Sequence, residues 1–150
     1  MTHDTPRQSL KDQVWLNVAQ QIARLSTCPR RQVGAVFLDE KGRVLATGRN
    51  GVPAGDPHCI DHPCPGAKLP SGTGLEKCEA IHAEQNAIAQ LKDLDKVHTV
   101  YCTTAPCIHC VKMICATSAK RIVFATPYPH PESEEYWTRR GGIWEHVPIK

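Results

Sequence analysis

The sequence lacks the features of membrane, secreted and nucleic-acid-binding proteins. No stretch reaches the roughly 18 consecutive apolar residues that a membrane-spanning helix needs. The N-terminal residues do not follow the pattern of a signal peptide. The formal net charge is only +3, and the pairs Arg30-Arg31 and Arg139-Arg140 are interpreted as solvent-exposed rather than as phosphate tracks. We therefore expect a cytoplasmic protein with neither a membrane nor a stable nucleic-acid partner.

The sequence also lacks internal repeats, and its composition does not change along the chain in a way that would indicate a second domain. A chain of 150 residues is expected to form a single domain, spanning 1–150, with its own hydrophobic core. Residues 1–9 are polar, and we expect them to be disordered. Eight cysteines would indicate disulfides in a small secreted protein. Here the spacing of several of them is typical of metal ligands, which favours zinc.

Helical and strand patterns alternate along the chain. Helical patterns cover 10–26, 80–91, 107–117 and 131–140, and strand patterns cover 32–38, 43–48, 97–102, 120–125 and 143–147. This order predicts a three-layer α/β fold in which a mixed five-stranded sheet carries helices on both faces. Between 49 and 77 the residues are glycine, proline and polar types without periodicity. A segment of that length without regular structure is usually functional or held in place.

Metal-ligand chemistry is concentrated in two short motifs, His82-Ala83-Glu84 and Pro106-Cys107-Ile108-His109-Cys110. One imidazole and two thiolates leave the fourth position of a tetrahedral zinc open for water, as in catalytic sites. Zinc lowers the pKa of that water, and Glu84 is placed to carry its proton to a leaving amine. H-x-E followed by P-C-x-x-C is the signature of zinc nucleobase deaminases, in which the glutamate is not a ligand.

The residues around these motifs fit such a site. Pro106 favours a helix start, so Cys107 and Cys110 would share one face at a helix N-terminus, where the helix dipole favours thiolates. The main-chain groups of Thr104 and Ala105 immediately precede this turn, and we expect them to receive the amino group of the substrate. A structural zinc finger is the alternative, but it would want a fourth ligand and would leave Glu84 without a role.

Four further cysteines suggest a second metal site. Cys28, Cys59, Cys64 and Cys78 lie outside the catalytic motifs and could hold a closed structural zinc, with His58 or His62 replacing one sulfur. The alternative is that some of them are inert buried residues. Cys102 and Cys115 lie within a predicted strand and helix and are assigned to packing.

The chain resembles the zinc-dependent cytidine and deoxycytidylate deaminases from about Cys28 to Val147. Besides the two zinc motifs, the resemblance rests on Gln32-Val33-Gly34-Ala35-Val36, on Asn50-Gly51-x-Pro53-x-Gly55 and on Glu84-Gln85-Asn86-Ala87. The last two of these segments look like the deoxycytidylate branch. The resemblance implies a cytidine-deaminase-like fold and zinc-dependent hydrolysis of dCMP to dUMP and ammonia. It also implies a homo-oligomer, from dimer to hexamer, with deoxynucleoside triphosphate effectors.

Substrate contacts are expected at residues that flank the predicted site. Asn50 is either an ordinary Asn-Gly turn residue or a ligand for the sugar or phosphate. Tyr128 either packs beside neighbouring prolines or, as the resemblance implies, helps to close the nucleotide site. Arg49 stands where the family usually has tyrosine. Because a guanidinium matches phosphate oxygens, we expect Arg49 to bind the 5′-phosphate, to alter substrate choice, or to remain a surface charge.

Two other functions remain as alternatives. A zinc deaminase could act on a nucleoside, another nucleotide, a base in RNA or single-stranded DNA, or a pterin-like ring. Macromolecular substrates need a basic track for the backbone, and the mild net charge disfavours them. A non-catalytic zinc-binding protein is the second alternative, and the presence of Glu84 argues against it.

Overall fold

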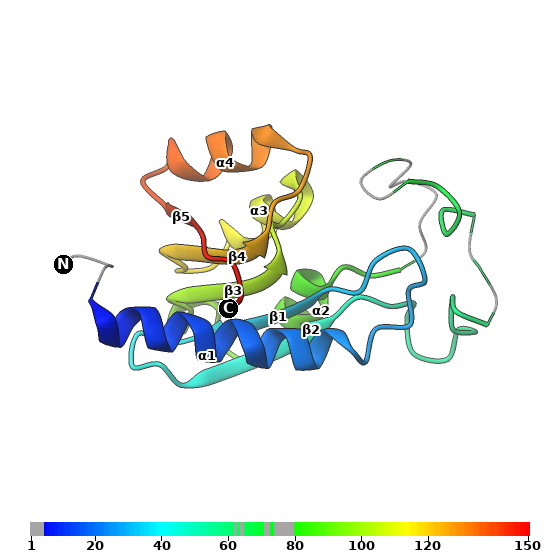
Figure 1. The fold of residues 1–150 in the computed structure, drawn as a ribbon, viewed down its shortest axis with the longest axis horizontal. Helices are drawn as coiled ribbons and strands as arrows, with labels where there is room; N and C mark the ends of the chain where they lie inside the picture. Colours follow the sequence, from blue (N-terminus) through cyan, green and yellow to red (C-terminus); the bar gives the residue numbers. More distant parts are fainter. Residues whose placement is uncertain (1–4, 62, 64, 71–72, 74–79) are drawn as a thin grey trace.

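The computed structural model describes residues 5–61, 63, 65–70, 73 and 80–150 (Figure 1). The helices are α1 (Pro6–Ala23), α2 (Ala83–Ala89), α3 (Ile108–Ile114) and α4 (Pro131–Thr138), with a short 3-10 turn, η2, at Leu94–Lys96. The strands are β1 (Gly34–Leu38), β2 (Val44–Arg49), β3 (Thr99–Thr104), β4 (Arg121–Thr126) and β5 (Ile143–His146). Within the described part of the chain, no helix has the length and apolarity needed to cross a membrane.

The strands form one mixed sheet, as predicted. Its order is β2-β1-β3-β4-β5, in a sheet of five strands. The first strand, β1, runs antiparallel to both of its neighbours, β2 and β3. Parallel pairing joins β3 to β4 and β4 to β5. Parallel neighbours need crossover connections, which here carry α3 and α4.

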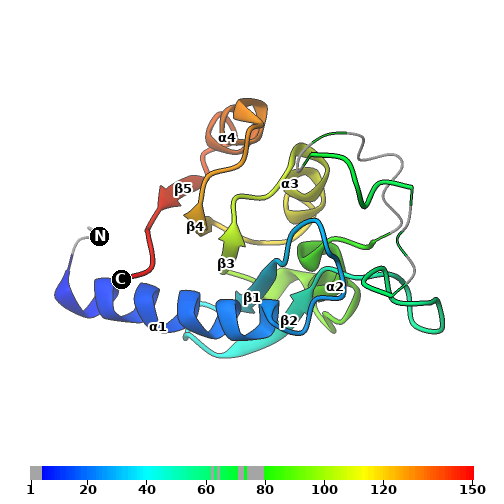
Figure 2. The same cartoon turned by 45° about the vertical axis from the view of Figure 1, so that its right-hand side comes forward.

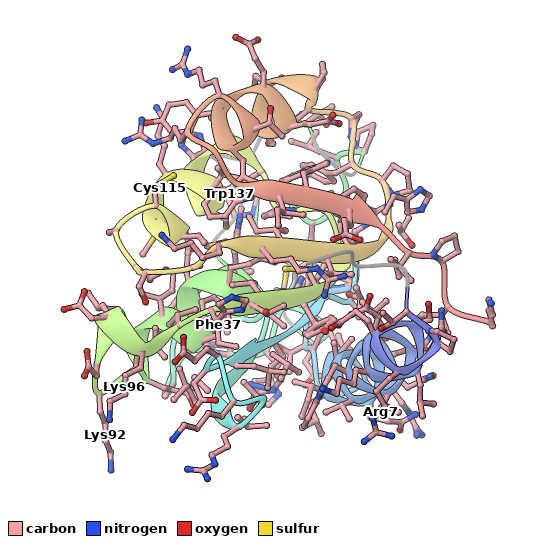
Figure 3. The ribbon with its side chains drawn as sticks, turned by 90° about the vertical axis from the view of Figure 1, so that its left-hand side faces the viewer. Arg7, Phe37, Lys92, Lys96, Cys115 and Trp137 are labelled. Atoms are coloured by element: carbon pink, nitrogen blue, oxygen red, sulfur yellow. The ribbon has the colours of Figure 1, made fainter. Side chains whose placement is uncertain are left out.

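The helices cover both faces of the sheet, which confirms the three-layer arrangement (Figures 1 and 2). Alternation along β1 separates the two cores: Val36 belongs to the α1 side and Phe37 to the opposite side. The α1 core consists of Leu16, Ala19, Val36, Leu38, Tyr101 and Val123. The larger core lies under α2, α3 and α4, and Figure 3 shows Trp137 of α4 directed toward the strands.

The first helix begins earlier than the sequence analysis predicted. Thr5 is its N-cap, with the side-chain oxygen accepting a hydrogen bond from the backbone N–H of Gln8 at 3.1 Å. Pro6 occupies the first turn, where a missing N–H costs nothing. Residues 6–9 are therefore helical, and the expectation that 1–9 are disordered is wrong for them. The polar composition of this segment concealed a Thr-Pro helix start.

A buried ion pair fastens α1 to the sheet. Both terminal nitrogens of Arg121 on β4 donate to the two carboxylate oxygens of Asp12, at 2.8 and 2.7 Å. The Tyr101 hydroxyl donates to Asp12 Oδ1 at 2.7 Å, and Arg121 Nε donates to Glu145 Oε1 at 2.7 Å. Asp12 and Arg121 are 3% and 2% exposed, so breaking the pair would leave a charge out of reach of water.

Candidate active site

Two helix N-termini meet at the predicted metal site. His82 is the N-cap of α2 and Cys107 is the N-cap of α3, one residue before each helix rather than within its first turn. The backbone N–H of His82 donates to the side-chain oxygen of Gln85 at 3.0 Å, as in a capping box. The cysteine turn follows directly on the end of β3, because Pro106 does not continue the strand.

The three predicted ligand atoms converge. His82 Nδ1 lies 3.2 Å from Cys110 Sγ and 3.5 Å from Cys107 Sγ. All three ligand atoms lie within 4.8 Å of one another. Around a tetrahedral zinc, bonds to sulfur and to imidazole nitrogen separate such atoms by roughly 3.6–3.8 Å. The donor set and its spacing therefore fit a zinc ion, with the fourth position left for a non-protein ligand.

Hydrogen bonds link the two thiols and the imidazole, and one of the thiols is strongly acidic. The hydrogen bonds with Cys110 and His82 together lower the pKa of the Cys107 thiol to about 3, against the opposing effect of burial. The same contact with Cys107, together with burial, raises the pKa of Cys110. A hydrogen bond with Cys107 raises the pKa of His82. A metal ion would replace the shared protons, because only deprotonated cysteine and neutral histidine are ligands.

Glu84 lies beside this cluster and is 4% exposed. Burial raises the pKa of its carboxyl group, although a hydrogen bond with Cys110 opposes that shift. A carboxyl group with a raised pKa is suited to both accepting and releasing a proton near neutral pH. The Cys102 thiol also contacts Glu84 through a hydrogen bond. Cys102 is fully buried as predicted, but its contact with Glu84 was missed, because strand periodicity does not reveal cross-element contacts.

An open pocket of about 570 Å³, including its solvent-exposed part, leads to the cluster. Of the predicted residues it is lined by His82, Glu84, Cys107, Thr104, Ala105, Asn50, Tyr128 and Cys28, the last of which was predicted for the second metal site. The backbone N–H of Ala105 donates to Thr126 O at 2.9 Å, which holds this part of the wall against β4.

Asn50 also has a structural role. Its Oδ1 accepts a hydrogen bond from the backbone N–H of Val33 at 2.9 Å, and its Nδ2 donates to the carbonyl oxygen of Arg31 at 2.6 Å. The side chain is 9% exposed and lines the pocket. Asn50 therefore holds the backbone of the segment that precedes β1, in addition to being a predicted substrate ligand.

Arg49 lies outside this pocket. It is exposed at the end of β2 and lines a different surface hollow, together with Asn86 and His58. The arginines that line the pocket are Arg30 and Arg31, which are half-buried. The interpretation of this pair as solvent-exposed is wrong, because the connection from α1 to β1 runs along the pocket wall. The composition of a loop does not predict which part of the protein surface the loop covers.

The predicted second metal site falls partly within the described residues. Cys28 and Cys59 are both buried, at 5% and 1% exposed. The backbone N–H of Ile60 donates to Thr27 O at 2.9 Å, which holds the two cysteine-bearing segments side by side. His58 is exposed. Cys64, Cys78 and His62 lie outside the described residues.

Known proteins share this sequence pattern. Residues 9–126 match the family described as the cytidine and deoxycytidylate deaminase zinc-binding region. The chain is 37% identical over 120 residues to the deoxycytidylate deaminase of Mycobacterium phage D29, covering 75% of this chain and 92% of that protein. It is 34% identical over 121 residues to the deoxycytidylate deaminase of Schizosaccharomyces pombe, covering 78% of this chain but only 37% of the yeast protein.

A solved structure shares the fold. The dCMP deaminase of cyanophage S-TIM5, in complex with dCMP and dUMP, superposes with a TM-score of 0.76 at 27% identity. The superposition covers 97% of this chain and 100% of the cyanophage chain. By the match over residues 9–126, the identity to the phage protein and the shared fold, the chain belongs to the cytidine and deoxycytidylate deaminase family.

Proposed function

We propose that the protein hydrolyses the 4-amino group of dCMP, giving dUMP and ammonia. The observation that carries this proposal is the buried Glu84 beside the converging His82, Cys107 and Cys110, in a pocket that two arginines also line. The names of the phage and yeast relatives and the nucleotides in the cyanophage structure support dCMP as the substrate.

In this proposal His82, Cys107 and Cys110 hold the catalytic zinc. When bound, zinc lowers the pKa of water so that a nucleophile for C4 of the cytosine ring is available near neutral pH. Glu84 accepts the proton of that water and donates it to ring nitrogen N3. Glu84 then takes the remaining proton from the hydroxyl group now on C4 and passes it to the amine, so that the C4–N bond breaks, ammonia leaves and the ring keeps the oxygen as a carbonyl.

The rest of the pocket orients the substrate. Main-chain groups of Thr104 and Ala105 receive the amino group, because they line the pocket next to the cysteine turn. Tyr128, which is half-buried in the pocket wall, packs against the nucleotide. Burial of Glu84 keeps bulk water from competing for the transferred proton.

A second, structural zinc is also proposed at Cys28 and Cys59, with Cys64 and Cys78 completing the ligand set. The burial of Cys28 and Cys59 and the Ile60–Thr27 hydrogen bond support this assignment. A closed site there would hold the long connection between β2 and α2 next to the pocket. That connection is already closed at its base, where Gly51 and Ile81 exchange two backbone hydrogen bonds.

We further propose a cytoplasmic homo-oligomer that responds to deoxynucleoside triphosphates. Three large apolar side chains are exposed on α1 and just beyond its end: Leu10 (52%), Val14 (46%) and Leu25 (62%). Exposed apolar surface of this kind favours burial against another copy of the chain. The hollow that contains Arg49 and Asn86 offers a cation and an amide for an effector.

Ammonia release from a panel of substrates tests the proposed reaction. The zinc-loaded protein is incubated with dCMP, CMP, deoxycytidine, dCTP and deoxyadenylate. We expect the highest kcat/KM for dCMP. Preferential release from deoxyadenylate, or from none of the cytosine compounds, would contradict the proposal.

A further inference from the structure

One guanidinium in the pocket wall has a buried N–H donor without a hydrogen-bond acceptor. Nη1 of Arg31 is buried and has no hydrogen-bond partner. Within the described ranges, the Arg31 side chain makes neither a hydrogen bond nor a salt bridge, and Cζ lies 5.8 Å from the centroid of the Tyr128 ring. A buried donor without an acceptor costs free energy that a bound acceptor would recover. Because Arg31 lines the pocket, that acceptor can come from a ligand.

The neighbouring arginine is already engaged. Nη1 of Arg30 donates to the carbonyl oxygens of Gly66 and Thr73, at 3.0 and 2.7 Å. Both carbonyls belong to the long connection between β2 and α2, so Arg30 ties that connection to the segment before β1. Of the two adjacent guanidinium groups, Arg30 has main-chain partners and Arg31 has none among the described residues.

Hydrogen bonds with the Asn50 side chain fix the backbone around Arg31. Asn50 accepts a hydrogen bond from Val33 N and donates to Arg31 O, so both sides of residue 32 are held by one side chain. A guanidinium on an anchored backbone loses less conformational entropy when it binds a ligand. This arrangement is typical of a preorganised anion site.

The ionisable groups that line the pocket come from different parts of the chain. Glu84, His82 and Cys107 lie at the metal position, whereas Arg30 and Arg31 belong to the α1–β1 connection. When the cytosine ring of dCMP lies at Glu84, the 5′-phosphate is the one anionic group that the rest of the pocket has to bind. The planar fork of arginine matches phosphate oxygens.

We propose that Arg31 binds the 5′-phosphate of the substrate and thereby sets the preference for a nucleotide over a nucleoside. This inference rests on the proposed dCMP deamination and assigns its specificity to a residue other than Arg49. Arg30 is a positioning residue that holds Gly66 and Thr73 of the β2–α2 connection.

The test compares kcat/KM for dCMP and deoxycytidine in the wild-type protein and in Arg31→Met, which removes the charge but keeps a long side chain. We expect the ratio of the two values to fall by about 10- to 100-fold, the usual effect of losing a charged hydrogen bond. Arg31→Lys should recover part of the ratio, because it restores the charge without the fork. Arg24→Met is the matched control: Arg24 is exposed and bonds only Gln21 among the described residues, so the ratio should stay at its wild-type value.

Calorimetric binding of dUMP and deoxyuridine gives a readout independent of turnover. Arg31→Met should weaken dUMP binding by the same factor and leave little difference between the two ligands. A wild-type preference for dCMP that survives in Arg31→Met, or an equal loss on both substrates, would overturn the inference while leaving the deamination intact. A wild-type protein that deaminates neither substrate would instead overturn the proposed function, and unaltered dUMP binding in Arg31→Met would then overturn this inference as well.

Discussion

Gly48 of β2 lies directly against Ala83 of α2: a Cβ atom on Gly48 would be 2.1 Å from the carbonyl oxygen of Ala83. Strand and helix therefore touch backbone to backbone at the first residue of α2. Because Ala83 lies between His82 and Glu84, this contact sets how far the metal ligand and the proton carrier stand from the sheet. A residue in a hairpin strand thus fixes the geometry of the site.

Gly48→Ala should push the start of α2 away from the sheet. We expect it to destabilise the protein by about 1–3 kcal/mol, as overpacking does, and to lower zinc affinity. Gly34→Ala is the matched control, because its Cβ would be 2.0 Å from the carbonyl oxygen of Ala19 on the opposite face. That variant should lose stability but keep its zinc affinity. Thermal unfolding and zinc titration distinguish the two effects, and equal zinc affinities in both variants would contradict this account.

Glu84→Gln should separate metal binding from proton transfer. The amide keeps the shape of the side chain but cannot accept and release the proton. We expect a folded, zinc-loaded protein whose kcat falls by at least the roughly 100-fold typical of a lost general acid/base. Metal analysis and steady-state kinetics on the same preparation check both parts. Turnover near the wild-type value would mean that another group carries the proton.

The Asp12–Arg121 pair should make stability fall in acid. Burial alone would raise the pKa of Asp12, but its hydrogen bonds with Arg121 and Tyr101 hold that pKa below the ordinary value of 3.8. The contribution is therefore present above pH 3.8 and is lost as the pH falls through the lower folded value. Urea unfolding from pH 7 down to about pH 2 measures this slope.

Asp12→Asn should remove that part of the acid dependence and cost about 1–3 kcal/mol at neutral pH, because buried donors of Arg121 lose their carboxylate and only Glu145 remains as a charged partner. Glu135→Gln is the control, since its ion pair with Arg139 is exposed and spans 4.0 Å. Little stability should be lost there. Equal stabilities of the two variants would show that the buried pair does not fasten α1 to the sheet.

The proposed structural zinc predicts a metal content of about two ions per chain. Cys59→Ser should remove one of them, lower the unfolding temperature and leave the other ion in place. Cys115→Ser, which changes a half-buried thiol at the end of α3, should keep both ions. Elemental analysis giving one zinc in the wild-type protein, with Cys59→Ser of normal stability, would exclude the second site.

Much of the fold could be predicted from local patterns. The apolar run of β1 and the cysteine turn after β3 are features of short sequence segments, so the sequence predicts the mixed sheet and the convergence of His82, Cys107 and Cys110. The start of α1 was predicted late because polar residues outweighed the Thr5-Pro6 signal. The apolar periodicity likewise predicts a start for α2 at residue 80, before the observed start at Ala83, because periodicity does not identify His82 as the N-cap.

Contacts between distant segments could not be predicted. Asp12 and Arg121 are separated by 109 positions, and nothing in either neighbourhood indicates a buried pair. The path of the α1–β1 connection decides that Arg31 lines the pocket while Arg49 faces another hollow. Such facts depend on how elements pack, whereas a sequence pattern reports only the periodicity within one element.

The formation of dUMP and ammonia from dCMP by the zinc-loaded protein tests the central claim most directly. Chromatography of the nucleotides and an ammonia assay on the same reaction should show equal amounts of both products. A chelator should abolish the reaction and added zinc should restore it, because the proposed nucleophile depends on the metal. A folded, zinc-loaded protein that leaves dCMP unchanged would contradict the account.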